Sequence, residues 1–172
     1  MKIALEFSIK TLFLGLVTLG LVCGCSSSPD QSTAEHQHYH HAPHGGTLVQ
    51  LGDEFCHLEF VLDSSQGELT AYVLDQEARS AVQVTGGPLK LHLKFSQAQA
   101  EELTLQPVAD PLTGETAENS SRFSGRSERL QGATSFEGVL QGITVKGRDF
   151  SEVEFSFPKG NEKVHDHHGD EH

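Results

Sequence analysis

Histidine is the residue whose number and spacing in this chain could support chemistry. Eleven histidines occur among 172 residues, and nine of them fall into two short polar segments. The histidines of these two segments are His36, His38, His40, His41 and His44, followed by His165, His167, His168 and His172. Neutral imidazole is a common ligand for zinc, copper and nickel. The pattern therefore predicts capture of a transition-metal cation, with Cu, Zn, Ni and Co as the candidates.

The spacing of these histidines favours an open and adaptable site. In an extended chain His36, His38 and His40 lie on one side of the backbone, and the second segment adds aspartate and glutamate ligands. Neither a CxxC pair nor an HExxH pattern is present, so a closed structural zinc site is not expected. Flexible ligands lose entropy on binding, so we expect micromolar affinity and mixed stoichiometry. The alternative is that both segments are solvated spacers.

The two remaining histidines lie in the body of the sequence. His57 and Glu59 lie two residues apart on a predicted strand, so their side chains point to the same face. We expect this face to be solvated. There they would form a weak surface site for a metal ion, or an ordinary solvated pair. His92 lies between Lys90 and Lys94, whose charges would repel a cation, so it is excluded as a ligand.

The sequence lacks the arrangements of residues that are typical of catalysis. It contains no GxSxG motif and no glycine-rich phosphate loop. Cys56 is in register with Leu58 and Phe60, so we expect a buried, inert thiol rather than a nucleophile. A non-enzymatic protein is therefore predicted.

The first residues are typical of an export signal. Lys2 and Lys10 make the start basic, and the apolar run over residues 11–22 is shorter than the ~20 residues that span a membrane. Residues 1–24 are thus expected to be a signal peptide. The alternative is an ordinary signal peptide cut nearby, without lipidation.

Cys25, with Gly24 before it and a polar stretch after it, resembles the lipobox of bacterial lipoproteins. Cys23 fits that pattern less well. The resemblance implies that Cys25 is lipidated, and Ser26 after it implies sorting to the outer membrane, with the protein facing the periplasm. Several acyl chains would anchor it firmly, since one chain gives only marginal binding.

The net charge of the chain limits the classes of partner that it is expected to bind. The net charge is −12 at pH 7 with neutral histidine, and removal of residues 1–24 makes it −13. Such a chain is not expected to bind nucleic acid, which requires a basic face. An acidic surface favours the collection of cations instead. Once Cys25 is acylated, Cys56 remains as a lone thiol, so no internal disulfide is expected.

Short runs rich in β-branched, Leu and Phe residues alternate with Gly, Asp, Ser and Pro clusters from residue 45 onwards. Many of these runs alternate apolar and polar residues, as Leu89, Leu91 and Leu93 do. They predict an all-β fold over residues 45–158: an antiparallel β-sandwich of about 7–8 short strands, immunoglobulin-like in style.

Three other segments have different characters. Residues 25–44 are expected to form a disordered His-rich tether, and residues 159–172 a disordered His/Asp-rich tail. Residues 109–133 predict a long loop with one short strand near residues 122–127, and residues 97–103 predict a turn or two of helix.

Pro43-His44-Gly45-Gly46 precedes a predicted strand, the next strand contains Glu59, and Tyr72-Val73-Leu74-Asp75 follows. Over residues 42–95 this resembles a small β domain of standalone bacterial lipoproteins. The same domain occurs at the front of periplasmic adaptor subunits of heavy-metal efflux pumps, often after a His-rich stretch. The resemblance implies transition-metal handling, with His44 as the motif histidine. The sequence lacks the adaptors' long coiled-coil hairpin, so it is not expected to bridge a pump to an outer channel.

Two functions are compatible with these patterns. The first is a membrane-anchored, non-enzymatic lipoprotein that binds or buffers metal cations outside the cytoplasm, alongside a heavy-metal efflux system. The second is a surface module that binds an efflux or envelope protein, with the His-rich segments as spacers. The sequence does not identify the metal or the protein partner.

Overall fold

The computed structural model describes residues 40–96 and 99–161, and this part of the chain is all-β. It contains ten strands, one 3-10 turn at Glu128–Leu130 (η1) and no α-helix. The strands are β1 (Thr47–Leu51), β2 (Cys56–Asp63), β3 (Glu68–Leu74), β4 (Val84–Thr85), β5 (Leu89–Ser96), β6 (Gln99–Pro107), β7 (Asn119–Ser120), β8 (Arg122–Arg126), β9 (Phe136–Val145) and β10 (Arg148–Phe157).

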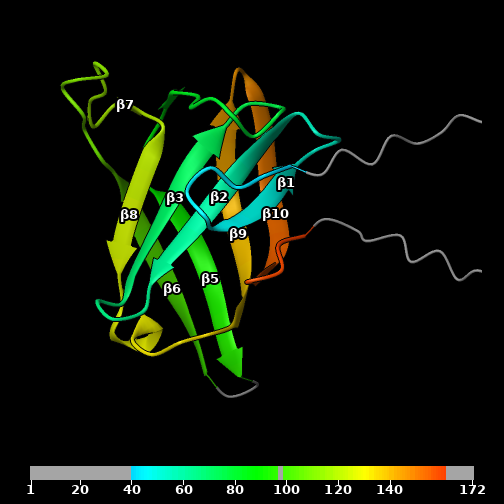
Figure 1. Cartoon of the computed structure of the whole chain (residues 1–172), viewed down its shortest axis with the longest axis vertical. Coiled ribbons are helices and arrows are strands. Elements are labelled where there is room, and N and C mark those ends of the chain that lie inside the picture. Colours follow the sequence, from blue (N-terminus) through cyan, green and yellow to red (C-terminus); the bar gives the residue numbers. More distant parts are fainter. Residues whose placement is uncertain (1–39, 97–98, 162–172) are drawn as a thin grey trace, which may run out of the picture. The chain divides into compact units, whose positions relative to one another are not determined.

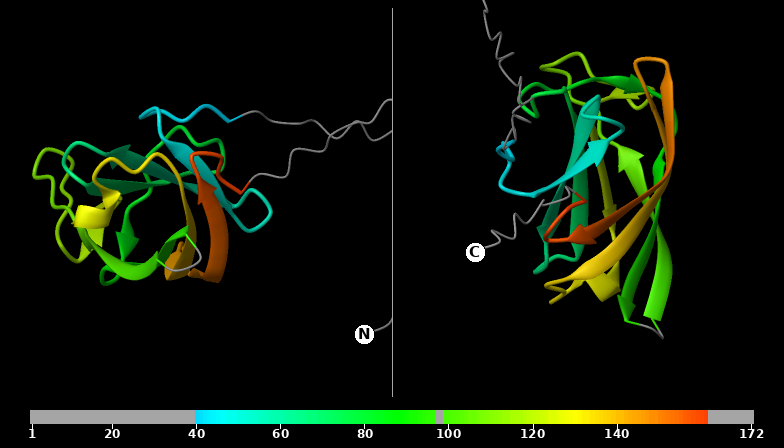
Figure 2. Two further views of the ribbon diagram at one scale, coloured as in Figure 1. Left: turned by 90° about the horizontal axis from the view of Figure 1, so that it is seen from below. Right: turned by 90° about the vertical axis from the view of Figure 1, so that its right-hand side faces the viewer.

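Eight of these strands form one antiparallel sheet in the order β1-β2-β3-β8-β6-β5-β9-β10, and β4 pairs with β7 separately (Figure 1). The two halves of the large sheet meet at a short β6–β8 ladder, where Gln106 pairs with Ser124 and Pro107 with Phe123. Figure 2 shows the sheet folded back on itself around the core. The predicted antiparallel sandwich is therefore confirmed, with both layers belonging to one continuous sheet.

The strands form where the sequence alternates. Along β5, Leu89, Leu91 and Leu93 are buried and the residues between them are exposed, as the period of two requires. Within the core, Phe60 of β2 stacks on Phe155 of β10 with ring centroids 4.5 Å apart. This aromatic contact joins the first and last parts of the folded sheet.

The free edge of β1 is covered by the residues that follow β10. The amide of Gln50 donates a hydrogen bond to Oδ1 of Asn161 at 2.8 Å, and Nδ2 of Asn161 donates to the carbonyl of Gln50 at 3.1 Å. The hydroxyl of Thr47 donates to the carbonyl of Pro158 at 3.1 Å. Asn161 thus satisfies the backbone of Gln50 as a neighbouring strand would. Residues 159–161, expected in the disordered tail, belong to the folded body.

Other sequence expectations differ from the structure. The helix expected over residues 97–103 is wrong for its described part, because β6 begins at Gln99 and pairs with β5. Leu103 and Leu105 face the core with the spacing of a strand. The short strand near residues 122–127 is confirmed as β8, although the surrounding loop also contains β7 and η1.

Gly138 of β9 is expected to tolerate no side chain, because a Cβ there would overlap the ring of Phe155. Replacing Gly138 by Ala should lower the free energy of unfolding by about 1–3 kcal/mol through overpacking. Gly142 on the same strand is the matched control, since the nearest atom to its Cβ would be the carbonyl oxygen of Phe150 at 3.6 Å. Urea unfolding measures both, and equal stability of the two variants would contradict this account of the core.

Candidate functional site

A buried carboxylate lies at the centre of the residues that the sequence singled out. Glu59 of β2 is 0% exposed. Its Oε1 accepts hydrogen bonds from the backbone amides of His44 and Gly46, each at 2.8 Å. Its Oε2 lies 2.7 Å from Nδ1 of His44. A buried carboxylate is costly unless it is paired and hydrogen-bonded, and these three contacts meet that requirement.

The ring of His44 is held from a second side by Tyr72. The two rings stack with centroids 3.7 Å apart and planes 8° apart. Tyr72 of β3 is the cross-strand partner of Glu59, so one pair of neighbouring strands positions both contacts of His44. We call His44, Gly46, Glu59 and Tyr72 the Glu59 clasp.

The two glycines of the Pro-His-Gly-Gly motif have different roles in the Glu59 clasp. Gly45 has a φ of 72°, in the left-handed region that favours glycine. Gly46 passes so close to β2 that a Cβ would lie 2.5 Å from the carbonyl oxygen of Phe60 and 3.0 Å from Cγ of Glu59. The motif therefore allows the chain to turn and then to approach the buried carboxylate with its amide.

The expectation of a solvent-facing pair at His57 and Glu59 is wrong. Both residues are 0% exposed, and five successive residues of β2, starting at Cys56, are buried. The cause is the segment leading to β1, whose His44 binds Glu59 and whose His40 contacts the ring of His57. A strand covered on both faces does not show the alternation of exposure that a half-solvated strand has.

His40 and His57 form a second contact between this segment and β2. Their ring centroids are 4.5 Å apart, with the planes tilted by 50°. Nδ1 of His57 lies 3.2 Å from the backbone carbonyl of Asp75. Asp75 follows β3 directly, and its side chain accepts hydrogen bonds from the amides of Arg79 and Ser80 in the next turn.

The predicted metal ligands separate into two groups. Cys25 and most of the tail histidines lie outside the described residues; these histidines are His36, His38, His165, His167, His168 and His172. His40, His41 and His44 lie inside, and His44 is not part of a disordered tether, because it is bound in the Glu59 clasp. Within residues 40–96 and 99–161, no group of three or more His, Cys, Asp or Glu side chains could hold a metal ion.

The two ends of the described chain meet the body at neighbouring positions. His40 contacts His57, and Asn161 is hydrogen-bonded to Gln50. Gln50 and His57 are direct partners in the β1–β2 ladder. Cα atoms of such partners lie about 4.5–5.5 Å apart. A sandwich fold predicts that its two ends lie close together, but the particular contacts depend on the fold of the whole sheet.

Cys56 is buried, as expected from its register with Leu58. Desolvation raises the pKa of its thiol to about 11, against the opposing charges of Lys146 and Arg148. The thiolate is therefore scarce at neutral pH, and the side chain is unsuited to nucleophilic attack or metal binding.

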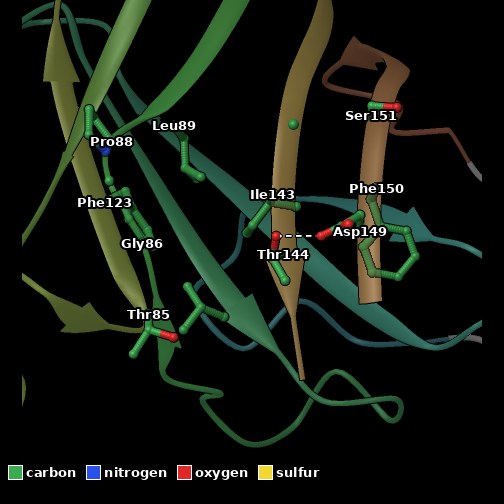
Figure 3. A pocket seen from close by; sticks show the side chains of 13 residues that line it. Thr85, Gly86, Pro88, Leu89, Phe123, Ile143, Thr144, Asp149, Phe150 and Ser151 are labelled. Carbon is green, nitrogen blue, oxygen red and sulfur yellow. Dashed lines mark hydrogen bonds between the residues drawn. The ribbon is translucent and has the colours of Figure 1, made fainter. Parts of the chain in front are cut away.

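A hollow of about 390 Å³ lies between the residues that precede β5 and the β9–β10 hairpin (Figure 3). Buried Leu89, Phe123 and Ile143 line it, and at its side the hydroxyl of Thr144 donates to Oδ1 of Asp149 at 2.6 Å. Its polar lining consists of Thr85, Thr144, Asp149 and Ser151, and no histidine, cysteine or lysine lines it.

Comparisons of the chain with protein-family models, with curated proteins and with solved structures found no match. The described residues also include no helix that is long and apolar enough to cross a membrane. The resemblance to efflux-adaptor domains therefore stays a prediction from the motif, and the function is argued from the geometry of the site.

Replacing Glu59 by Ala should release the segment before β1, because the amides of His44 and Gly46 lose their acceptor. We expect the free energy of unfolding to fall by about 2–4 kcal/mol. Replacing the exposed Glu154 of β10 by Ala is the matched control and should change it by less than about 0.5 kcal/mol. Hydrogen exchange should show faster exchange of the His44 and Gly46 amides in the Glu59 variant; unchanged protection would refute the clasp.

Proposed function

We propose that this protein is a lipid-anchored, non-enzymatic component of the bacterial cell envelope that binds transition-metal cations outside the cytoplasm. The observation that supports this most directly is the convergence of the two chain ends on Gln50 and His57. His38 precedes His40 by two residues, and His165 follows Asn161 by four. The described residues to which the two His-rich segments are attached therefore contact neighbouring positions of the body.

When two segments that each bind an ion weakly are attached at neighbouring points, they bind a shared ion more tightly than either segment alone. Once one segment holds an ion, the second segment meets that ion at a high effective concentration, which raises the overall affinity. The net charge of −12 adds a general attraction for cations. Imidazole and carboxylate ligands together fit borderline divalent ions, so Cu, Zn, Ni and Co remain the candidates.

The Glu59 clasp changes which histidines we assign to the segments. His44 serves the fold through its ring and its amide, and His40 contacts the ring of His57, so we leave both out of the set. The proposed segment ligands are His36, His38, His41, His165, His167, His168 and His172. Binding in the periplasm next to a heavy-metal efflux system is the setting that the motif resemblance supports.

Metal binding by the segments can be tested with a variant in which these seven histidines are alanine. Equilibrium dialysis against Zn²⁺ or Cu²⁺ should show several ions per wild-type chain and at least a tenfold loss of total binding in the seven-alanine variant. Equal binding by the two proteins would overturn the proposal. A partner that is still captured from membranes by the variant would then favour the alternative, a protein-interaction module with spacer segments.

Lipid attachment is tested by replacing Cys25 with Ser. The protein should move from the membrane fraction to the soluble fraction of the envelope, because its remaining charge does not favour anionic lipid. Cys23→Ser is the matched control, two residues away, and should stay in the membrane fraction. Release of the Cys23 variant instead would place the lipid on that residue.

A further inference from the structure

We propose that the hollow beside the β9–β10 hairpin binds a short extended peptide of another protein, which adds as a strand to the free edge of β9. The peptide carries an apolar side chain that enters the hollow, next to a lysine or arginine. This inference goes beyond the proposed metal binding, because it concerns another part of the body and involves no histidine.

The edge of β9 is free beyond Leu140. The ladder between β5 and β9 ends at the pair of Leu91 with Leu140, although β9 continues to Val145. On its other side β9 stays paired with β10 up to the hairpin turn. Among the described strands, the last part of β9 therefore has a neighbour on one side only, and its other side borders the hollow (Figure 3).

The hairpin turn decides which backbone groups of β9 face the hollow. The two residues after Val145 have φ values of 49° and 78°, as in a type I′ turn. Val145 therefore exchanges backbone hydrogen bonds with β10, and this orientation alternates along a strand. The amides and carbonyls of Gly142 and Thr144 then point away from β10. Within the described residues these groups have no hydrogen-bond partner, and both residues are exposed, so a ligand can reach them.

Strand addition at this edge determines the position of each peptide side chain. A peptide that pairs with Gly142 and Thr144 exchanges two backbone hydrogen bonds with each of them. Its residue opposite Ile143 projects to the same face as Ile143, which is buried and lines the hollow. Leu89 and Phe123 line the same space. An apolar side chain therefore fits at the central position of the peptide.

The hollow has room for such a side chain. Its volume of about 390 Å³ lies within the ~300–1,000 Å³ usual for ligand pockets. Its wall before β5 includes Gly86 and Gly87, where a Cβ would meet no atom within 4 Å. Gly142 has no side chain that could obstruct the approach of a peptide to the edge of β9.

The charge at the hollow favours a basic neighbour for the apolar residue. Asp149 is the one charged residue of the lining, and its Oδ1 accepts a hydrogen bond from the hydroxyl of Thr144. No lysine or arginine of the described residues forms an ion pair with it. Arg148 precedes it but lies over the ring of Phe150, on the other face of β10. A lysine or arginine opposite Thr144 can therefore approach an unpaired carboxylate.

The proposal can be tested with the synthetic peptide Ser-Thr-Lys-Leu-Tyr-Thr-Ser, acetylated and amidated at its ends. Antiparallel addition places its leucine opposite Ile143 and its lysine opposite Thr144. NMR of the isotope-labelled chain should show shifted methyl signals for Ile143. The amides of Gly142 and Thr144 should exchange at least tenfold more slowly with the peptide bound, while the amide of Gly46 in the Glu59 clasp should be unaffected.

Two altered peptides are the matched controls. Methylation of the backbone nitrogens of the lysine and the tyrosine removes the donors to β9, and should weaken binding at least tenfold. Replacing the lysine by glutamate should weaken binding about two- to fivefold, as expected for an exposed ion pair. The variant Asp149→Lys should reverse that preference and favour the glutamate peptide. Asp149 is exposed, so this variant should fold, which urea unfolding checks.

Three outcomes would overturn the proposal. The first is unchanged exchange of the Gly142 and Thr144 amides when the peptide is added. The second is equal binding of the methylated and unmethylated peptides, since binding would then not use the edge of β9. The third is self-association of the chain that protects the same two amides without any peptide, which would assign the edge to a second copy of this protein.

Discussion

The buried carboxylate of Glu59 is the constraint on which the arrangement of this protein depends. A charged group with no exposure requires donors, and here the donors come from a segment that would otherwise have no reason to lie on the sheet. The stacked ring of Tyr72 and the missing side chain of Gly46 both serve that approach. The Pro-His-Gly-Gly motif, which resembles that of metal-efflux modules, is therefore explained first by its contribution to folding.

Fixing this segment has consequences for the rest of the molecule. It covers the outer face of β2, places His40 on His57 and delivers the chain into β1. From the other side, Asn161 brings the end of the described chain to the adjacent position on β1. The metal binding proposed for the two His-rich segments therefore depends on contacts of the Glu59 clasp and of Asn161, which are not themselves proposed as ligands of the segments.

The sequence was sufficient for the architecture, because period-two alternation in runs such as Leu89 to Leu93 follows directly from strand geometry. It was misleading for β2, where the same alternation placed His57 and Glu59 on a solvated face. Local pattern cannot show that a distant segment will cover a strand, since that contact depends on tertiary packing. The pairing of Asn161 with Gln50, 111 residues apart, could not be predicted for the same reason.

The amide side chain of Asn161 has a further consequence for self-association, which matters most in the lipid-anchored state that we propose. Copies tethered to one membrane in that state would be concentrated in a layer, and an open strand edge would let them join by β-sheet extension. At Gln50 that edge is already occupied by a side chain rather than by a strand, so a neighbouring copy has no backbone groups to pair with there. One asparagine can in this way help to keep a concentrated layer of molecules from polymerising.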